Sequence, residues 1–303
     1  MDNATTNTLI IAFGMLFVVL NALALGMSAH IGDVLAHFAR NWKSAVLILV
    51  VNFVIIPGLV VGLTALLDIP SDLKIGFCIV ALVAGAPFAP LLTRLARGDV
   101  ATSTTMFIAL TVGTILLAPL FLPLAVTALV PSVGLQSYWD VAWPLLAFLA
   151  APIALGCIAR LRYPRFAQAV QKPFRIVYIV CLLLYVNVFI VGYWSLFTQA
   201  WGSGAYLAAF GVPILGILFG SLLGARTRGI RHARVITTAE RSISGAIIVT
   251  VFSYTQPLAN VAVTIINTIA IVILLVLSLE WGRAAARRTQ AAAPAASAAA
   301  TPR

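Results

Sequence analysis

The sequence predicts an all-α integral membrane protein with about nine transmembrane helices. Of its 303 residues, 62% are hydrophobic and only 9% are charged, which leaves too little polar surface to coat a soluble globule of this size. The apolar residues form runs of roughly 20 or more, the length that a helix needs to cross a bilayer, whereas barrel strands are about ten residues long with alternating polarity. Lys and Arg gather in alternate connections between these runs, which supports the same division of the chain.

The expected spans are apolar windows bounded by charged or Pro- and Gly-rich breaks. They lie near residues 8–30, 44–67, 73–93, 101–129, 139–159, 174–195, 205–225, 235–255 and 258–281. No basic residue precedes the first run and no small-residue cleavage site follows it, so we expect a retained helix and not a cleaved signal. Residues 284–303 are rich in Ala, Pro, Thr and Arg, and we expect a disordered cytoplasmic tail there.

The distribution of basic residues predicts the orientation of the chain. Lys and Arg follow the first, third, fifth, seventh and ninth spans, whereas the intervening connections hold only Lys74. Cytoplasmic loops are enriched in Lys and Arg. We therefore expect a multi-pass protein of the inner membrane, with its N-terminus outside and its C-terminus in the cytoplasm.

Composition and motifs argue against nucleic-acid binding and against catalysis. The net charge of +11 is scattered over short loops and not gathered on one face, so we expect a lipid bilayer as partner and no nucleic acid. His30, His37 and His232 lie near the cytoplasmic ends of spans, with no HExxH or paired-carboxylate pattern. Three cysteines inside apolar runs show no CxxC spacing. We expect no enzyme, no metal centre and no cofactor.

Two adjacent charges, Glu240 and Arg241, stand inside an expected span, in the segment TTAERSISGA of residues 237–246. Each costs roughly 2.5–3.5 kcal/mol at a helix centre even on insertion scales, so both should face a cavity or a partner. Neighbours on a regular helix point about 100° apart, so the two charges share a face only if the helix is interrupted. A structural ion pair or a polar patch facing the bundle is the alternative.

The third span carries a second disruption, the segment GAPFAP of residues 85–90. Pro87 and Pro90 each remove a backbone donor and clash with the preceding turn, which predicts a kink or a break. A merely bent helix is the alternative. The third and eighth spans run in opposite directions on the expected topology, and many secondary transporters place such interrupted helices of two inverted repeats around a central solute site. Half-helix N-termini attract anionic groups there.

Several segments together resemble members of the bile acid:sodium symporter family over nearly the whole chain. They are LGMSAHIGDV (25–34), VNFVIIP (51–57), LTRLARGDVATS (92–103), LLAPLFLP (116–123) and TTAERSISGA (237–246). The resemblance implies one transporter domain, residues 1–283, in which a core contains two crossing, broken helices and a smaller panel packs beside it. The core would comprise the spans near 44–129 and 205–281, and the panel those near 8–30, 139–159 and 174–195.

The sodium sites of that family do not transfer whole. Where typical members have a Ser and an Asn in the first crossing helix, this chain has Ala89 and Pro90, which offer no side-chain oxygen. Where members have a Glu and a Gln four residues apart in the second crossing helix, it has Thr237 and Arg241. A cation binds best in a cage of several oxygens, and this set has lost a carboxylate and gained a fixed cation.

We therefore expect sodium coupling to be weakened or absent, with Arg241 as a built-in counter-ion for an organic anion, since Arg stays protonated and presents five donors. A shift of the alignment by one residue would instead place Glu240 near a ligand position and favour sodium. The resemblance gives Asn52 the place of a family Gln and Ser103 that of a sodium-binding Ser. The expected substrate-binding residues are Pro87, Pro90, Glu240, Arg241 and Ser242, and the expected weak ion-binding residues are Asn52, Ser103 and Thr237.

The expected function is secondary transport of a small organic anion by alternating access. Arsenite carriers of the same superfamily are the nearest alternative, because they share the LARGD turn of residues 95–99. They use a Cys in the break of the first crossing helix, whereas GAPFAP has none and Cys78 lies about two turns earlier. A membrane protein that transports nothing is the other alternative.

Overall fold

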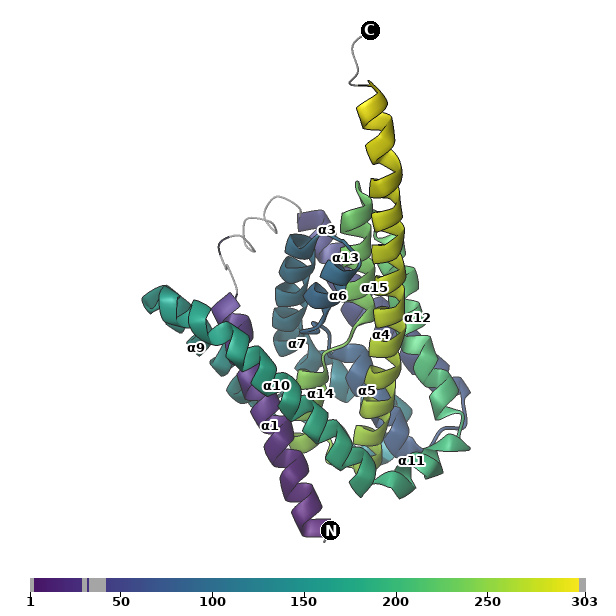
Figure 1. Cartoon of the computed structure of the whole chain (residues 1–303). Helices are drawn as coiled ribbons and strands as arrows, with labels where there is room; N and C mark the ends of the chain where they lie inside the picture. Colours follow the sequence, from purple (N-terminus) through teal and green to yellow (C-terminus); the bar gives the residue numbers. More distant parts are fainter. Residues whose placement is uncertain (1–2, 29–31, 33–41, 300–303) are drawn as a thin grey trace.

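The computed structural model describes residues 3–28, 32 and 42–299, and this part of the chain is helical without a β-strand (Figure 1). The predicted all-α class is therefore confirmed. The histidines at 30 and 37 and half of the segment 25–34 lie outside the described residues. The helices are α1 (Asn3–Ser28), α3 (Trp42–Val50), η1 (Val51–Ile55), α4 (Ile56–Leu66), α5 (Ser71–Leu82), α6 (Ala89–Leu95), α7 (Val100–Leu129), η2 (Pro131–Val133), α8 (Tyr138–Leu145), η3 (Leu146–Ala150), α9 (Ala151–Arg162), α10 (Pro164–Gly192), α11 (Trp194–Trp201), α12 (Ala205–Leu222), α13 (Arg228–Ala239), α14 (Ile243–Phe252) and α15 (Pro257–Ala299).

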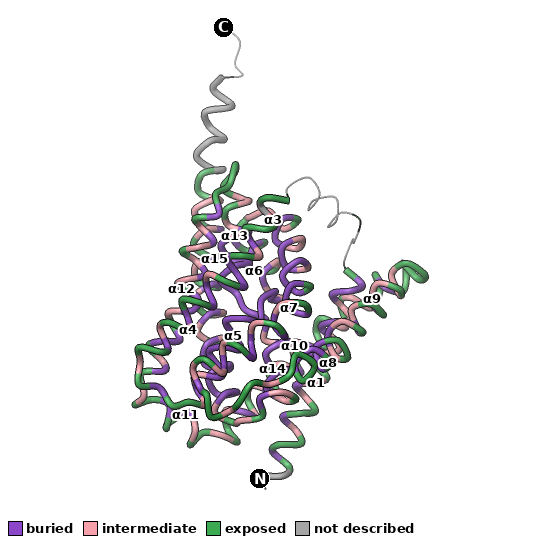
Figure 2. The backbone as a smooth tube through the Cα atoms, turned by 180° about the vertical axis from the view of Figure 1, so that it is seen from behind, coloured by how far each residue is buried: buried purple, intermediate pink, exposed green. Residues whose placement is uncertain are grey.

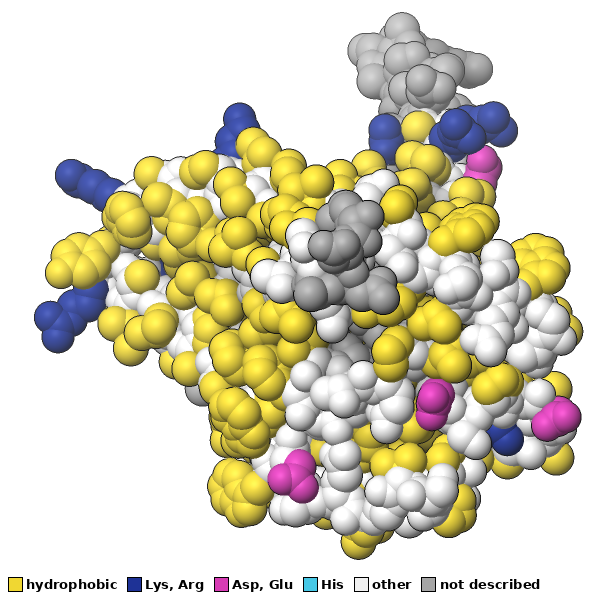
Figure 3. Space-filling view, turned by 90° about the horizontal axis from the view of Figure 1, so that it is seen from below, with side chains coloured by type: hydrophobic (Ala, Val, Ile, Leu, Met, Phe, Trp, Pro, Cys, Tyr) yellow, Lys and Arg dark blue, Asp and Glu magenta, His cyan; other side chains and the backbone are white. Residues whose placement is uncertain are grey.

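Seven helical segments in the described part are long and apolar enough to cross a membrane, which makes the chain a multi-pass membrane protein. Large apolar side chains are exposed along them, for example Val177 and Leu184 on α10, as expected for surfaces that contact lipid. Apolar side chains also dominate the view from the end where α1 begins (Figure 3). The seven segments are Thr5–Ser28, Ala45–Leu66, Val100–Leu129, Tyr138–Arg162, Pro164–Gly192, Ala205–Leu222 and Pro257–Arg288.

The two remaining predicted spans, near 73–93 and 235–255, are each divided into two short helices. The first comprises α5 and α6 with a non-helical stretch between them, and the second comprises α13 and α14 with a break at residues 240–242. The interruptions expected at GAPFAP and at TTAERSISGA are thus confirmed, and the merely bent helix is excluded. The total of nine spans stays a prediction.

The helices form two neighbouring groups. One group consists of α1, α9 and α10, which pack on one another and which we call the α1 group; in Figure 1 it lies to one side of the rest. The other contains the two interrupted pairs together with α7, α12 and α15. Buried residues concentrate around α5, α6 and α14, whereas α9 and much of α10 are exposed (Figure 2).

The C-terminal segment differs from the prediction of a disordered tail. Helix α15 continues through Ala299, beyond the last apolar residues of the expected span. Ala has the highest helix propensity of all residues, and the run from 284 to 299 is rich in it, so the backbone extends the preceding helix.

Candidate functional site

The two interruptions lie side by side at the centre of the molecule. Ala84 and Arg241 form an antiparallel bridge, and the backbone N–H of Ser242 donates to the carbonyl oxygen of Val83 at 3.1 Å. A break frees backbone groups that need partners when buried. Here the backbone of each break provides hydrogen-bond partners for the backbone of the other. We call the place where the two interrupted segments meet the crossing.

The first break depends on Gly85 and on a threonine of α7. Gly85 adopts φ +85°, a left-handed conformation that favours glycine, and a Cβ atom there would lie 2.6 Å from the backbone nitrogen of Thr111. Beside it, Thr114 uses one hydroxyl for two backbone groups of Ala84. The hydroxyl accepts from the N–H at 2.9 Å and contacts the carbonyl oxygen at 2.8 Å. Residue Pro90 then lies in the first turn of α6, where its missing N–H costs little.

The second break begins where Glu240 leaves the helical conformation, at φ −83° and ψ 133°. Ser242 caps the following helix, because its hydroxyl accepts from the backbone N–H of Gly245 at 3.3 Å. Ser244, in the first turn of α14, accepts from the side-chain amide of Asn21 at 2.9 Å. This bond ties the broken helix to α1, in the neighbouring group.

Arg241 is a buried guanidinium at the crossing, with 2% of its surface exposed. Its Nη1 donates to Oδ1 of Asn52 at 3.3 Å, while Nε and Nη2 are buried without a hydrogen-bond partner. Asn52 lies in the π-helical turn η1 and also donates to the carbonyl oxygen of Ile48 at 2.9 Å. The structure therefore brings two predicted residues, Asn52 and Arg241, into contact, with unused donors on the cation.

Glu240 does not share the partner of Arg241, although the two residues are neighbours in the sequence. It is 4% exposed, its carboxylate accepts from the backbone N–H of Phe88, and its Oε2 atom has no partner. Between these two residues the structure gives no ion pair. The structural ion pair that the sequence left open is thus excluded, and an uncompensated charge of either sign is costly in such surroundings.

Three hydroxyl groups form a chain beside the crossing. Thr93 donates to Ser103 at 3.1 Å, and Ser103 lies 2.9 Å from the hydroxyl of Thr237. All three residues are fully buried. Their oxygens bind one another, and this chain of hydroxyl groups contains no carboxylate.

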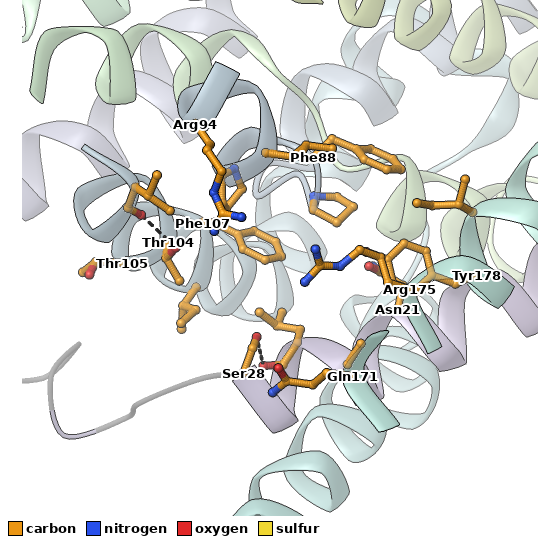
Figure 4. Close-up of a pocket in the computed structure, with 18 of the residues that line it drawn as sticks. Asn21, Ser28, Phe88, Arg94, Thr104, Thr105, Phe107, Gln171, Arg175 and Tyr178 are labelled. Atoms are coloured by element: carbon orange, nitrogen blue, oxygen red, sulfur yellow. Dashed lines mark hydrogen bonds between the residues drawn. The ribbon is translucent and has the colours of Figure 1, made fainter. Parts of the chain in front are cut away.

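A cavity of about 550 Å³ separates the α1 group from α6 and α7 (Figure 4). Its walls come from α1, α10, α6 and α7, together with the first break. The lining residues are Asn21, Ala24, Leu25 and Ser28 of α1, Gln171, Arg175, Tyr178 and Ile179 of α10, Pro87 and Phe88 of the first break, Pro90, Leu91 and Arg94 of α6, and Val100, Ala101, Thr104, Thr105, Phe107 and Ile108 of α7.

The lining includes two of the expected substrate-binding residues, Pro87 and Pro90. The other three, Glu240, Arg241 and Ser242, are buried and do not line it. Sequence reasoning missed Arg94 and Arg175, which it used only as markers of cytoplasmic loops. Arg175 reaches the cavity from α10, which packs on α1, and Arg94 reaches it from α6. No spacing in the sequence signals that the two arginines line the same cavity.

The family comparison agrees with this architecture. The chain matches the sequence model of the Sodium Bile acid symporter family over residues 15–200, more than half of its length. The matched part contains α5, α6 and α7, and hence the first break and most of the cavity wall. No curated protein matches the chain.

Proposed function

Because this chain belongs to the sodium bile acid symporter family, whose members are transporters, we propose that it is a secondary transporter of a small organic anion that works by alternating access. The single observation that carries this proposal is the cavity between the α1 group and the crossing helices, whose described lining includes two arginines and no acidic residue. A positive cavity of this size suits a small anion.

In the proposed mechanism the α1 group is the panel, and the two interrupted pairs with their neighbours are the core. The crossing of α5–α6 and α13–α14 makes the core rigid, since each break satisfies backbone groups of the other. The panel rocks against it and opens the cavity to alternate sides of the membrane. The two interrupted pairs would correspond to one another in inverted repeats, within a nine-span inner-membrane protein whose N-terminus lies outside.

We further propose that Arg241 replaces the sodium ion of related carriers. Its guanidinium is held by Asn52 at the crossing and keeps two nitrogens without a partner. A fixed positive charge there stabilises an anion in the neighbouring cavity and disfavours a second cation. Transport should then run without sodium.

Uptake into proteoliposomes tests this proposal. Purified protein is reconstituted, and uptake and counterflow of labelled organic anions are measured with and without an inward sodium gradient. We expect saturable flux that is stimulated by counterflow and equal in both conditions. Strict dependence on sodium would exclude the role of Arg241, whereas the absence of counterflow for every anion would exclude a carrier.

Substitution of Arg241 gives the residue-level test. Arg241→Ala should reduce flux by roughly tenfold or more, because it removes the fixed positive charge at the crossing, and a loss of about 1.4 kcal/mol of electrostatic stabilisation already corresponds to a tenfold change. The matched control is Arg165→Ala, which removes an exposed arginine of α10 that does not line the cavity. Size-exclusion profiles confirm that each variant is folded. Normal affinity and flux in Arg241→Ala would rule out this residue as the anion's counter-ion.

An arsenite carrier is less well supported. Its chemistry needs a thiolate at the site, and Cys78 is 1% exposed within α5 and does not line the cavity. The described lining offers no sulfur atom.

A further inference from the structure

Two arginines enter the cavity from opposite walls. Arg94 comes from α6, beside the first break, and Arg175 comes from α10, in the α1 group. Figure 4 shows both guanidinium groups directed into the space near Phe107. One positive charge therefore belongs to each of the two groups of helices that face one another across the cavity.

Neither arginine has a counter-charge within the described structure. Both side chains are exposed to the cavity, and neither has an ion pair or a hydrogen bond to another residue. In the described residues the nearest acidic side chain in sequence, Asp99, caps α7 by accepting from the N–H of Thr102 at 3.0 Å and is not part of the lining. Two like charges in one cavity repel each other, more strongly as water leaves it.

The surface between the arginines is mostly apolar. Phe88, Phe107 and Tyr178 lie among the lining residues, and Tyr178 packs edge-on against Phe17 with ring centroids 6.2 Å apart. The polar lining residues besides the arginines include Gln171 of α10 and Thr104 of α7. A ligand that fits this lining has charged ends and a short apolar middle.

We propose that the substrate carries two anionic groups, as a small dicarboxylate does, and that it bridges Arg94 on one wall to Arg175 on the other. This inference rests on the proposed transport function and names the substrate class. The dianion neutralises both cations and links the two groups of helices, so that the loaded cavity closes more readily than the empty one. A monoanion leaves one guanidinium without a counter-charge, so the cavity closes less readily around it.

Ligand binding tests the proposal without requiring transport. The thermal stability of detergent-purified protein is measured with a series of dicarboxylates of four to six carbons and with the monoamide of each, because a ligand that binds only the native state raises the unfolding temperature. We expect at least one dicarboxylate to bind about tenfold or more tightly than its monoamide, as the loss of one charge-assisted pair predicts. Equal binding of the diacid and its monoamide would overturn the proposal.

Substitutions of the two arginines test whether they cause the preference for the diacid over its monoamide. Arg94→Gln and Arg175→Gln should each reduce the preference for the diacid to less than about threefold, while leaving binding of the monoamide nearly unchanged. Arg97→Gln and Arg165→Gln are the matched controls, since both remove exposed arginines near the same helices that do not line the cavity. The controls should keep the full preference. A preference that survives both cavity variants would contradict the bridge.

Three further outcomes separate this inference from the proposed function and from a lipid. Saturable flux of monoanions that Arg94→Gln and Arg175→Gln do not alter would support the proposed transport function and refute the proposal of a dianionic substrate. Stabilisation by anionic phospholipid, with none by any soluble diacid, would assign the two arginines to a lipid headgroup and also refute it. Diacid binding without flux would support the site and count against transport.

Discussion

At the scale of single residues, Gly85 shows how a missing side chain shapes the site. Its φ of +85° and the 2.6 Å that would separate a Cβ atom from the nitrogen of Thr111 both exclude other residues. The sequence pointed to Pro87 and Pro90 as the cause of the break. Pro90 lies in the first turn of α6, but α5 already ends at Leu82, before both prolines, and the backbone that follows turns at this glycine.

Gly85→Ala should therefore lower the stability of the protein. The strained dihedral and the clash with α7 together cost about 1–3 kcal/mol or more. Thermal unfolding in detergent measures the loss. Gly58→Ala is the control, because a Cβ atom at this exposed position of α4 meets nothing within 4 Å, and its effect should stay within about 1 kcal/mol. Equal stability of the two variants would show that the first break tolerates a side chain.

Glu240 and Arg241 illustrate what the sequence could predict of the site and what it could not. Two adjacent charges inside an apolar run predicted an interruption, because neighbours on a helix face different directions, and the interruption is present. Their partners could not be predicted. Arg241 reaches Asn52, which lies 189 positions earlier, and Glu240 reaches the backbone of Phe88. Such contacts follow from the packing of the whole chain and leave no local pattern.

At the scale of helices, α7 holds the first break in place through Thr114. Its hydroxyl serves both backbone groups of Ala84, and both residues are buried. Thr114→Val keeps the shape of the side chain but leaves a buried N–H without a partner, which should cost about 1–3 kcal/mol. Thermal unfolding measures this cost.

The matched control for Thr114→Val is Thr111→Val, one turn earlier on the same helix. The Thr111 hydroxyl donates only to the carbonyl oxygen of Phe107, a group whose helical hydrogen bond remains after the change. The loss there should be less than about 1 kcal/mol. Equal losses in the two variants would mean that the hydroxyl of Thr114 contributes nothing specific to the break.

His232 lies where α13 packs on α15. Its ring stacks on Trp281 with centroids 4.2 Å apart, and Nδ1 lies 3.3 Å from the carbonyl oxygen of Ala96. Desolvation by burial lowers the pKa of His232, an effect that the hydrogen bond to Ala96 opposes and that Arg231 and Arg228 reinforce. The neutral ring is therefore the form that the fold favours.

The sign of the pH effect follows from that lowered pKa. Above the ordinary histidine value of about 6.5 the ring is neutral in folded and unfolded chains alike, so it adds no dependence on pH. As the pH falls below that value, the unfolded chain takes up the proton first and the folded state loses stability. The unfolding temperature of His232→Gln should fall less than that of the unchanged protein between pH 7.5 and pH 5. Parallel curves would show that this histidine is not the group responsible.

At the scale of the whole molecule, hydropathy and charge predicted the class, the long helices and the position of both interruptions. These features depend on composition and local pattern, which one sequence contains. The cavity could not be predicted in this way, because Arg94 and Arg175 belong to two connections that both looked like ordinary basic loops in the sequence. Only the packing of α10 on α1 and the inward turn of α6 give them a common space. Residues 284–299, where a disordered tail was expected, are helical, since a run rich in Ala extends α15 there.

The proposed rocking of the α1 group against the crossing helices predicts which cross-links stop transport. With Cys78, Cys157 and Cys181 replaced by Ala, the pair Ser28→Cys and Thr104→Cys places one thiol on α1 and one on α7, on facing sides of the cavity. A bifunctional thiol reagent that joins them should abolish counterflow, because the walls can no longer separate.

The pair Ser28→Cys and Gln171→Cys is the control, since both residues belong to the α1 group and Gln171 already donates to the carbonyl oxygen of Met27 at 2.9 Å. Its cross-link should leave most of the flux, as the two helices are expected to move together. Undiminished flux with α1 joined to α7 would mean that solute crosses without any relative movement of the two groups, and alternating access would have to be abandoned.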